Sequence, residues 1–362
     1  MSQLDATAVR QTLAGFGSNT LTLYLDINPA ASVNQGTRPA WKIWTKNAIK
    51  EIDAAVDESQ RADWEQVHAR LDDFLDNYSA QGRSLALFVG PDDMASYTLP
   101  ITMEPRSSFG PPLVTPLLWA LEEYARYMIV MIDREKVRLL TASLNQPETD
   151  EKMHFELDDY DFAERPQMPP TSGQPGEMLR KGNMREAYED MIDAHRQRFF
   201  RDAAERVMEV AEARDVHGMV LGGNEEAAHH LRELLHVEFR PLVIDVQPIP
   251  QHLADHAVLK QVQPAFLKHE RAKENEMVDR VLDVAHAGGK ATIGVTAVER
   301  ALDEQRVEML LLPFPVDNAT DALAYKALRN NAKIELVGGE AAQKLTEAGG
   351  VAANLYYELP TS

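Results

Sequence analysis

The sequence predicts an α/β protein of three domains. Short apolar runs with strand composition alternate with segments whose apolar residues recur every three or four positions, as they do in helices. At 362 residues, the chain is also longer than a single hydrophobic core usually serves. We expect an N-terminal α/β domain at residues 1–113, a central α/β domain at 114–258, and a compact C-terminal α/β/α sandwich with a leading helix at 259–362.

The first third is predicted to hold a strand, two helices and a second strand. Residues 21–26 have strand composition, and residues 84–90 form an apolar run typical of a buried strand. Between them, the apolar residues of 41–56 and 64–75 recur at helical spacing. Residues 105–116, which are rich in proline and glycine, are predicted to contain the first domain boundary.

The central third is dominated by one long helical pattern. From Asn183 to Val210, apolar residues recur every three or four positions, which is typical of a helix with one buried stripe. Met184 and Met191 lie on this stripe and are expected to pack in the core. In chain order, the predicted elements are a helix at 117–124, strands at 127–132, 136–143 and 152–157, the long helix, a strand at 219–221, a helix at 225–235 and a strand at 242–245.

The last third alternates regularly between helices and strands. A long, mostly helical pattern at 251–284 leads into it and is expected to connect two domains. Regular alternation with short connections predicts a compact α/β/α unit. The expected elements are helices at 296–305, 321–330 and 341–347, and strands at 307–312, 333–337 and 351–357.

The composition excludes several classes of protein. A formal net charge of −20 disfavours non-specific coating of nucleic acid, which Lys and Arg side chains drive by displacing counterions from phosphates. The chain has no cysteine, so disulfides, thiol nucleophiles and zinc sites with cysteine ligands are excluded. The acidic run at 148–164 is expected to form a solvated edge or loop.

The chain shows no sign of a membrane or secretory segment. Its N-terminus lacks the charged and apolar regions of a signal peptide. The apolar window at 113–132 is interrupted by Glu122, Glu123 and Arg126, which a bilayer core would penalise. We expect a soluble, cytoplasmic protein.

Three local motifs have simple interpretations. His252 and His256 lie four residues apart, a spacing that would place them on one helical face, but the glutamate of a zinc-hydrolase motif and a distal ligand are missing. We therefore expect no metal, and no other cofactor. The adjacent His229 and His230 would point to different sides of a helix. Asn224 follows a predicted strand and is expected to cap the next helix.

A family resemblance rests on the order and spacing of residues 289–353. Gly289-Lys-Ala-Thr-Ile-Gly294 is followed by the apolar strand at 307–312 and by Gly349-Gly-Val-Ala-Ala353. This pattern resembles the C-terminal domain of archaeo-eukaryotic class-1 release factors and Pelota. The middle third, with strands, a Gly-Gln loop, a long helix and Val220-Leu-Gly-Gly-Asn224, resembles the central domain of that superfamily. The first third, with the strand Leu21-Thr-Leu-Tyr-Leu-Asp26, is similar to the N-terminal domain of its bacterial branch, so the resemblance spans nearly the whole chain.

The resemblance implies a functional loop in the central domain. Codon-reading release factors carry Gly-Gly-Gln at the tip of a loop before a long helix, and this chain has Ser172-Gly173-Gln174 at that position. A glycine permits close backbone approach, and an amide N–H can stabilise negative charge that develops on an ester oxygen. By this resemblance, Gly173 and Gln174 are the candidate catalytic residues.

The neighbours of the tip differ from the family pattern. Ser172 replaces the first glycine, and Pro175 favours extended geometry at the preceding residue while removing a donor. The residues that the resemblance assigns to tRNA binding are Arg180, Lys181 and Arg185. These and the other basic residues near them can also be read as the solvated face of a helix, paired with acidic residues at helical spacing.

Three functions remain open from the sequence. One is a release-factor-like translation factor that binds the ribosome and tRNA in ribosome rescue, quality control or dormancy without catalysis. Another is a peptidyl-tRNA ester hydrolase that uses Gln174. The third is an acidic protein-protein scaffold with no ribosomal role. Stop-codon reading is disfavoured, because residues 45–51 break the Asn-Ile-Lys-Ser spacing. A translational GTPase is an open partner; membrane and DNA are not expected.

Overall fold

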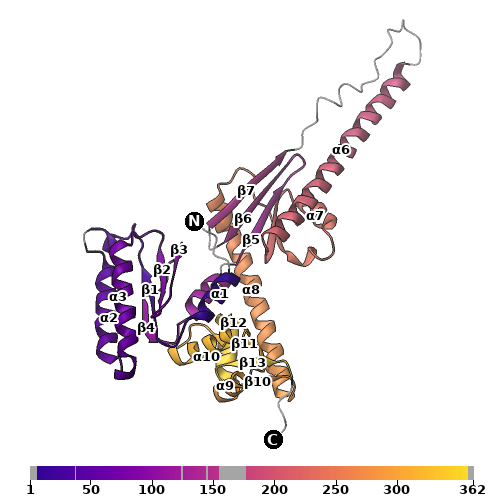
Figure 1. The fold of residues 1–362 in the computed structure, drawn as a ribbon. Helices are drawn as coiled ribbons and strands as arrows, with labels where there is room; N and C mark the ends of the chain where they lie inside the picture. Colours follow the sequence, from indigo (N-terminus) through magenta and orange to yellow (C-terminus); the bar gives the residue numbers. More distant parts are fainter. Residues whose placement is uncertain (1–5, 37, 124, 144–145, 155–176, 358–362) are drawn as a thin grey trace. The chain divides into compact units, whose positions relative to one another are not determined.

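The computed structural model describes residues 6–36, 38–123, 125–143, 146–154 and 177–357 (Figure 1). It is a mixed α/β structure with three sheets. The chain divides into two compact units, one formed by Met1–Tyr124 with Lys268–Ser362 and the other by Ala125–Leu267. This division differs from the three domains predicted above, each of which would contain one of the three sheets. The boundaries of those three domains stay a prediction.

The first sheet lies in the N-terminal part of the first unit. Its four strands are antiparallel and have the order β3-β2-β1-β4. The apolar residues of β1 alternate, so that Leu21, Leu23 and Leu25 pack on Trp41 and Trp64 of two helices that lie side by side. The elements are α1 (Ala6–Gly15), β1 (Thr20–Asp26), η1 (Ser32–Asn34), α2 (Ala40–Ala55), η2 (Glu58–Gln60), α3 (Arg61–Asn77), β2 (Ser84–Val89), β3 (Met94–Leu99) and β4 (Arg106–Gly110).

The predicted strands and helices of this part are confirmed, but three elements were missed. Helix α1 and strands β3 and β4 have no strong periodicity in the sequence. Residues 105–116, predicted only as a boundary segment, hold β4 and the start of the next helix. The Arg-Ser-Ser-Phe-Gly sequence of β4 has little strand preference, and it is a strand because its backbone pairs with β1.

The second sheet of this unit lies near the C-terminus and has the order β10-β13-β11-β12. Strands β11 and β12 are parallel, whereas β13 is antiparallel to both β10 and β11. Leu311 and Ala352 pack on one face against Val281 and Leu345 from two helices. The elements are α4 (Thr115–Glu123), the end of α8 (Asp255–His286), β10 (Ala291–Ile293), α9 (Val295–Asp303), β11 (Val307–Pro313), α10 (Asn318–Arg329), β12 (Lys333–Val337), α11 (Gly339–Ala348) and β13 (Ala352–Leu355).

Side-chain hydrogen bonds join the two chain segments that form the first unit. The buried carboxylate of Asp321 in α10 accepts hydrogen bonds from the backbone N–H of Val114 at 2.7 Å and from the N–H and hydroxyl of Thr115. The hydroxyl of Tyr325 donates to the carbonyl of Phe16. These bonds link positions more than 200 residues apart, which explains why the two ends of the chain fold as one unit.

The second unit contains a five-stranded sheet with helices on both faces. Its order is β7-β6-β5-β8-β9, with β5, β8 and β9 parallel and β6 and β7 antiparallel to their neighbours. Helices α6 and α7 contribute to the core on one face, and the first half of α8 packs on the other. The elements are β5 (Tyr127–Ile132), β6 (Lys136–Ser143), β7 (Gln146–His154), α6 (Glu177–Ala213), β8 (Gly218–Gly223), α7 (Glu225–Leu234), η3 (Arg240–Leu242) and β9 (Val243–Gln247).

Several expectations for this unit are confirmed and two are corrected. The long helix is present as α6 and begins before residue 183, and the start of the acidic run lies in the edge strand β7. An edge strand tolerates carboxylates because one of its sides is open to solvent. The third central strand, expected at 152–157, begins earlier, at Gln146, and the expected residues 155–157 lie outside the described residues. The helical pattern expected from residue 251 begins at Asp255, so His252 lies before α8 rather than on one helical face with His256.

Candidate functional site

The predicted site lies at the start of α6 and in the segment that precedes it. Gly173 and Gln174 lie outside the described residues. Arg180, Lys181 and Arg185 lie within α6, but their side chains are outside the described part of the structure. Their proposed roles therefore stay predictions, and the described residues show how α6 and the strand before it are held.

Among the described side chains of α6, from residue 190 onward, burial is found in the C-terminal half of the helix. Its first buried side chains, among those described, are Phe199 and Phe200, and burial continues through Ala203 and Val207. From residue 190 to residue 198 every side chain is at least partly exposed, including Met191, which was expected in the core. A helix of 37 residues rises by about 55 Å. The N-terminal half of α6 accordingly runs beyond the strands of its sheet (Figure 1).

An ion pair connects the two elements that flank residues 155–176. The guanidinium of Arg206 in α6 donates to both carboxylate oxygens of Glu151 in β7, from Nε to Oε2 at 3.0 Å and from Nη2 to Oε1 at 3.1 Å and Oε2 at 2.9 Å. Arg206 also donates to Glu209 at 2.9 Å, and Glu209 followed by Glu151 raises the pKa of Arg206. Both side chains of the Arg206–Glu151 pair are roughly two-fifths exposed, so the pair adds geometric definition more than stability.

A cleft of about 350 Å³ lies beside the middle of α6, at the carboxyl edge of β5 and β8. Glycine is required at the turn there, because Gly223 has a φ of 94° and an added Cβ would lie 2.2 Å from the carbonyl oxygen of Ile132. The next residue, Asn224, caps α7 as predicted, with its side-chain oxygen accepting from the N–H of Ala227 at 3.0 Å. This is the edge at which open α/β sheets commonly bind ligands.

The charged side chains of this cleft are paired with one another. Arg134 lies 3.2 Å from Glu226, and Arg196 lies 2.9 Å from Asp193. The ring of His230 packs edge-on against Phe200 at a centroid distance of 4.9 Å, which links α7 to α6. The cleft offers donors and acceptors for binding, with its guanidinium groups already neutralised by carboxylates. The cleft lies along the described part of α6, and its lining residues do not include the predicted catalytic pair Gly173 and Gln174.

Sequence reasoning singled out Asn224 and His230 but did not predict that the residues of this cleft would come together. Arg134 and Glu226 are separated by 92 positions in the chain, and Arg206 and Glu151 by 55. The only local signal was the turn after the apolar strand at 127–132, which places a charged residue at the carboxyl edge of the sheet. The order of the strands in the sheet determines which side chain such a residue meets, and the spacing of apolar residues in the sequence does not predict that order.

Metal-binding groups and membrane-spanning helices were searched for among the described residues. There, no group of three or more His, Asp or Glu side chains is arranged to hold a metal ion. His252 and His256 are both exposed, and Asp255 between them pairs with the buried guanidinium of Arg138. No helix in the described part of the chain is both long and apolar enough to cross a bilayer.

Comparison with known families identifies the segment that contains this site. Residues 112–266 match the model of bacterial archaeo-eukaryotic release factor family 10. The match covers less than half of the chain. The predicted resemblance to the bacterial branch of the release factor and Pelota superfamily is thereby confirmed. The family 10 match includes α4, the whole five-stranded sheet, α6, α7 and the first part of α8, whereas the motifs at 289–353 lie outside it. No curated protein matches the sequence.

Solved structures of the wider superfamily are similar to the chain at low identity. Archaeal Pelota, in a model of ribosome-bound archaeal Pelota and ABCE1, is 14% identical over 98% of this chain and 95% of that chain, with a TM-score of 0.47. Dom34 of S. cerevisiae is 14% identical over 79% of this chain and 77% of its own, with a TM-score of 0.46. The archaeal termination factor aRF1 is 17% identical over 97% of both chains, with a TM-score of 0.26. With TM-scores under 0.5, these likenesses support no further conclusion about this chain.

Proposed function

We propose that the protein is a release-factor-like translation factor that binds the ribosome and tRNA and acts in ribosome rescue, quality control or dormancy. The observation that carries the proposal is the family 10 match over residues 112–266, because it spans β7, the predicted Gly173-Gln174 tip and α6 in one segment. The release-factor description of the family indicates a role in translation, and a role in translation favours the cytoplasm.

The anchoring of α6 supports this proposal. Burial from Phe199 onward fixes the C-terminal half of the helix on the sheet, while the Arg206–Glu151 pair ties the helix to β7. The N-terminal half of the helix, which runs beyond the strands in Figure 1, contains Arg180, Lys181 and Arg185. The amino end of a helix has a partial positive charge, and α6 begins at Glu177, close after Gln174. Anionic tRNA is favoured at such an end.

The other parts of the chain are assigned by the sequence resemblance. We place an N-terminal domain at 1–113, the central domain at 114–258 and a C-terminal α/β/α domain at 259–362 that corresponds to the C-terminal domain of release factors. Dom34 is described as interacting with Hbs1, and archaeal Pelota has been placed on the ribosome with ABCE1. A translational GTPase is the partner class we add to the ribosome and tRNA for this chain.

The first experiment measures ribosome binding by co-sedimentation. Reversing the three predicted tRNA contacts (Arg180→Glu, Lys181→Glu, Arg185→Glu) should weaken binding by about 10-fold or more at moderate salt, since each removes a cation that contacts phosphate. The matched control reverses three exposed arginines outside the predicted contact, namely Arg198, Arg201 and Arg232. Equal losses in the two variants would contradict the assigned surface. Wild-type protein that does not sediment in low salt would favour the scaffold function instead.

A second candidate function is peptidyl-tRNA ester hydrolysis, favoured by the position of Gly173-Gln174 between β7 and α6. The side-chain and backbone amides of Gln174 would donate to the ester oxygen as charge develops there. Peptide release from stalled ribosomes tests it: Gln174→Ala should lower the release rate by about 10-fold or more, because a donor to the developing charge is lost. Equal, near-background release by wild type and variant would leave the binding function alone.

A further inference from the structure

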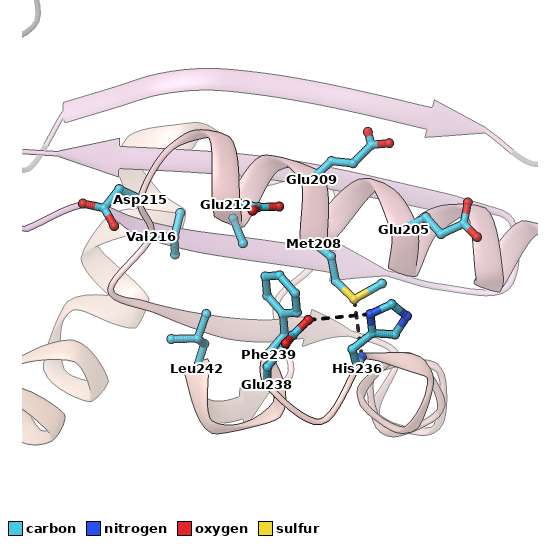
Figure 2. Close-up of a pocket in the computed structure, with 11 residues that line it drawn as sticks. Glu205, Met208, Glu209, Glu212, Asp215, Val216, His236, Glu238, Phe239 and Leu242 are labelled. Atoms are coloured by element: carbon cyan, nitrogen blue, oxygen red, sulfur yellow. Dashed lines mark hydrogen bonds and ion pairs between the residues drawn. The ribbon is translucent and has the colours of Figure 1, made fainter.

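A second surface of the central unit is an open groove that the proposed function does not use. It has a volume of about 720 Å³ and lies between the C-terminal part of α6 and the segment that joins α7 to β9 (Figure 2). Met208 and Val216 line it from one side, and Phe239 and Leu242 line it from the other. Phe239 and Leu242 are only partly buried, so the floor of the groove is apolar surface that water reaches.

The rim of this groove is acidic. Glu205, Glu209 and Glu212 follow one another along α6, Asp215 comes just after the helix, and Glu238 lies across the groove. No Lys or Arg is among the lining residues, although Arg206 pairs with Glu209 from the neighbouring helix position. The last turn of α6 holds no basic residue, so the carboxylates of Glu209 and Glu212 add to the negative end of the helix dipole.

This charge arrangement favours a cationic ligand. Carboxylates at i,i+4 spacing repel one another, although Arg206 offsets this at Glu209, and a cation rather than an anion is favoured near a helix C-terminus. A cationic ligand would relieve both terms. A nucleic acid would add its own negative charge, so the groove disfavours RNA.

The segment opposite α6 presents a further apolar side chain. Val237 is 79% exposed and lies between His236 and Glu238. The backbone N–H of His236 donates to the sulfur of Met208 at 3.3 Å, which fixes this segment against the helix. The imidazole of His236 lies 3.9 Å from the carboxylate of Glu238. The groove therefore has an apolar floor and an anionic rim, and the exposed Val237 lies next to two of its lining residues, His236 and Glu238.

We infer that this groove docks a basic amphipathic segment of a partner protein. An apolar side chain of that segment would pack between Met208 and Phe239. Its Lys or Arg side chains would pair with Glu205, Glu212 and Glu238. Amphipathic helices bind grooves in this way, with apolar anchors on one face and charges that set orientation. The inference concerns a protein partner and does not depend on tRNA contact by the opposite half of α6.

The test is fluorescence anisotropy with a labelled synthetic peptide made of two Lys-Leu-Ala-Lys-Leu-Ala-Lys repeats, at 0.15 M salt. Neutralising the rim (Glu205→Gln, Glu212→Gln, Glu238→Gln) should weaken binding by about 10-fold, as expected for the loss of close charge pairs. The control neutralises Asp72, Asp73 and Asp76 to asparagine. These exposed carboxylates lie at the C-terminal end of α3, which, like α6, has no basic residue in its last turn. Both variants neutralise three carboxylates, so they change the net charge of the protein by the same amount.

The α3 control should bind within about twofold of wild type, because its carboxylates line none of this groove. A second peptide with every Leu replaced by Ser should bind wild type at least about 10-fold more weakly, since the apolar floor loses its partner. Equal weakening in the two protein variants would overturn the inference, as would equal binding of the two peptides. Absence of binding by wild type, or preference for an oligouridine RNA over the peptide, would also overturn it. Circular dichroism melting of both variants checks that they fold.

Discussion

At the scale of single residues, Asp321 shows how a buried carboxylate is accommodated. Its side chain has no exposed surface, and desolvation raises its pKa to about 6, opposed by the hydrogen bonds from Thr115 and Val114. The N–H donors belong to the residues at the start of α4, so the carboxylate of one helix satisfies the orphan donors at the amino end of another. This contact joins the two chain segments of the first unit.

The raised pKa of Asp321 makes unit stability depend on pH. A carboxyl with a raised pKa in the folded state stabilises fully below its unfolded pKa, near 3.8, and loses this contribution as pH rises through about 6. The free energy of unfolding of wild type, relative to Asp321→Asn, should therefore fall by about 2–3 kcal/mol from pH 4 to pH 7. Urea unfolding followed by tryptophan fluorescence measures it, at two pH values that avoid the pI near 5.0.

Comparing wild type with Asp321→Asn removes the contribution of another buried carboxyl, Glu122, to the pH dependence of the free energy of unfolding. Burial also raises the pKa of Glu122, to about 8, while Arg10 opposes the shift. Glu122 is present in both proteins, so its titration cancels in the difference. A difference that stays constant, or that grows with pH, would show that Asp321 is not held as a buried acid.

At the scale of elements, helix ends are set by short-range contacts that the sequence encodes locally. Asn224 has extended backbone geometry, with φ of −79° and ψ of 127°, and its side chain bonds to Ala227 three residues on. Two acidic residues follow in the first turn of α7, where their negative charge interacts favourably with the positive end of the helix dipole. Asn224 also lines the cleft beside α6, so a substitution at this position changes the edge of that cleft as well as the helix cap.

Removing this cap should destabilise the second unit. Asn224→Ala is expected to lower the free energy of unfolding by about 1 kcal/mol, whereas Asn224→Ser should stay within a few tenths of wild type, because serine also caps. Amide hydrogen exchange over residues 225–228 gives the local effect, with faster exchange in the alanine variant alone. Identical exchange in wild type and the alanine variant would contradict a capping role.

At the scale of the whole molecule, the two units have separate cores. The cluster around Leu23 and Trp64 and the cluster around Leu311 belong to the first unit, whereas the clusters around Val207 and Phe266 belong to the second. All four tryptophans of the chain, Trp41, Trp44, Trp64 and Trp119, lie in the first unit. Their fluorescence therefore reports the unfolding of that unit.

Separate cores predict separate unfolding transitions. In urea, the transition followed by tryptophan fluorescence should differ in midpoint from the transition followed by far-UV circular dichroism, which reports the helices of both units. Truncation after residue 267 should lower the fluorescence midpoint, since Phe16, Val114 and Thr115 lose their partners in α10. Coincident curves for the full chain would contradict the independence of the two cores.

The extent to which the fold could be predicted follows from the range of each signal. The apolar runs at 127–132 and 307–312 and the stripe of α6 from Phe199 were readable because each is a local pattern. The strands β4 and β10 were missed, since five and three residues carry little periodicity and both depend on pairing with another strand. The acidic edge strand β7 was recognised only in its last residues for the same reason.

Local sequence patterns were enough to predict most of the longer helices and strands and the cap at Asn224, and the match of residues 112–266 to release factor family 10 likewise rests on a continuous segment of sequence. Three features depend instead on how the chain packs in three dimensions: the contact of Asp321 with Thr115, the ion pair of Arg206 with β7, and the carboxylates of α6 around an apolar groove. Such contacts join residues that chain spacing leaves unrelated, and their free energy exists only once strand order and helix packing bring them together.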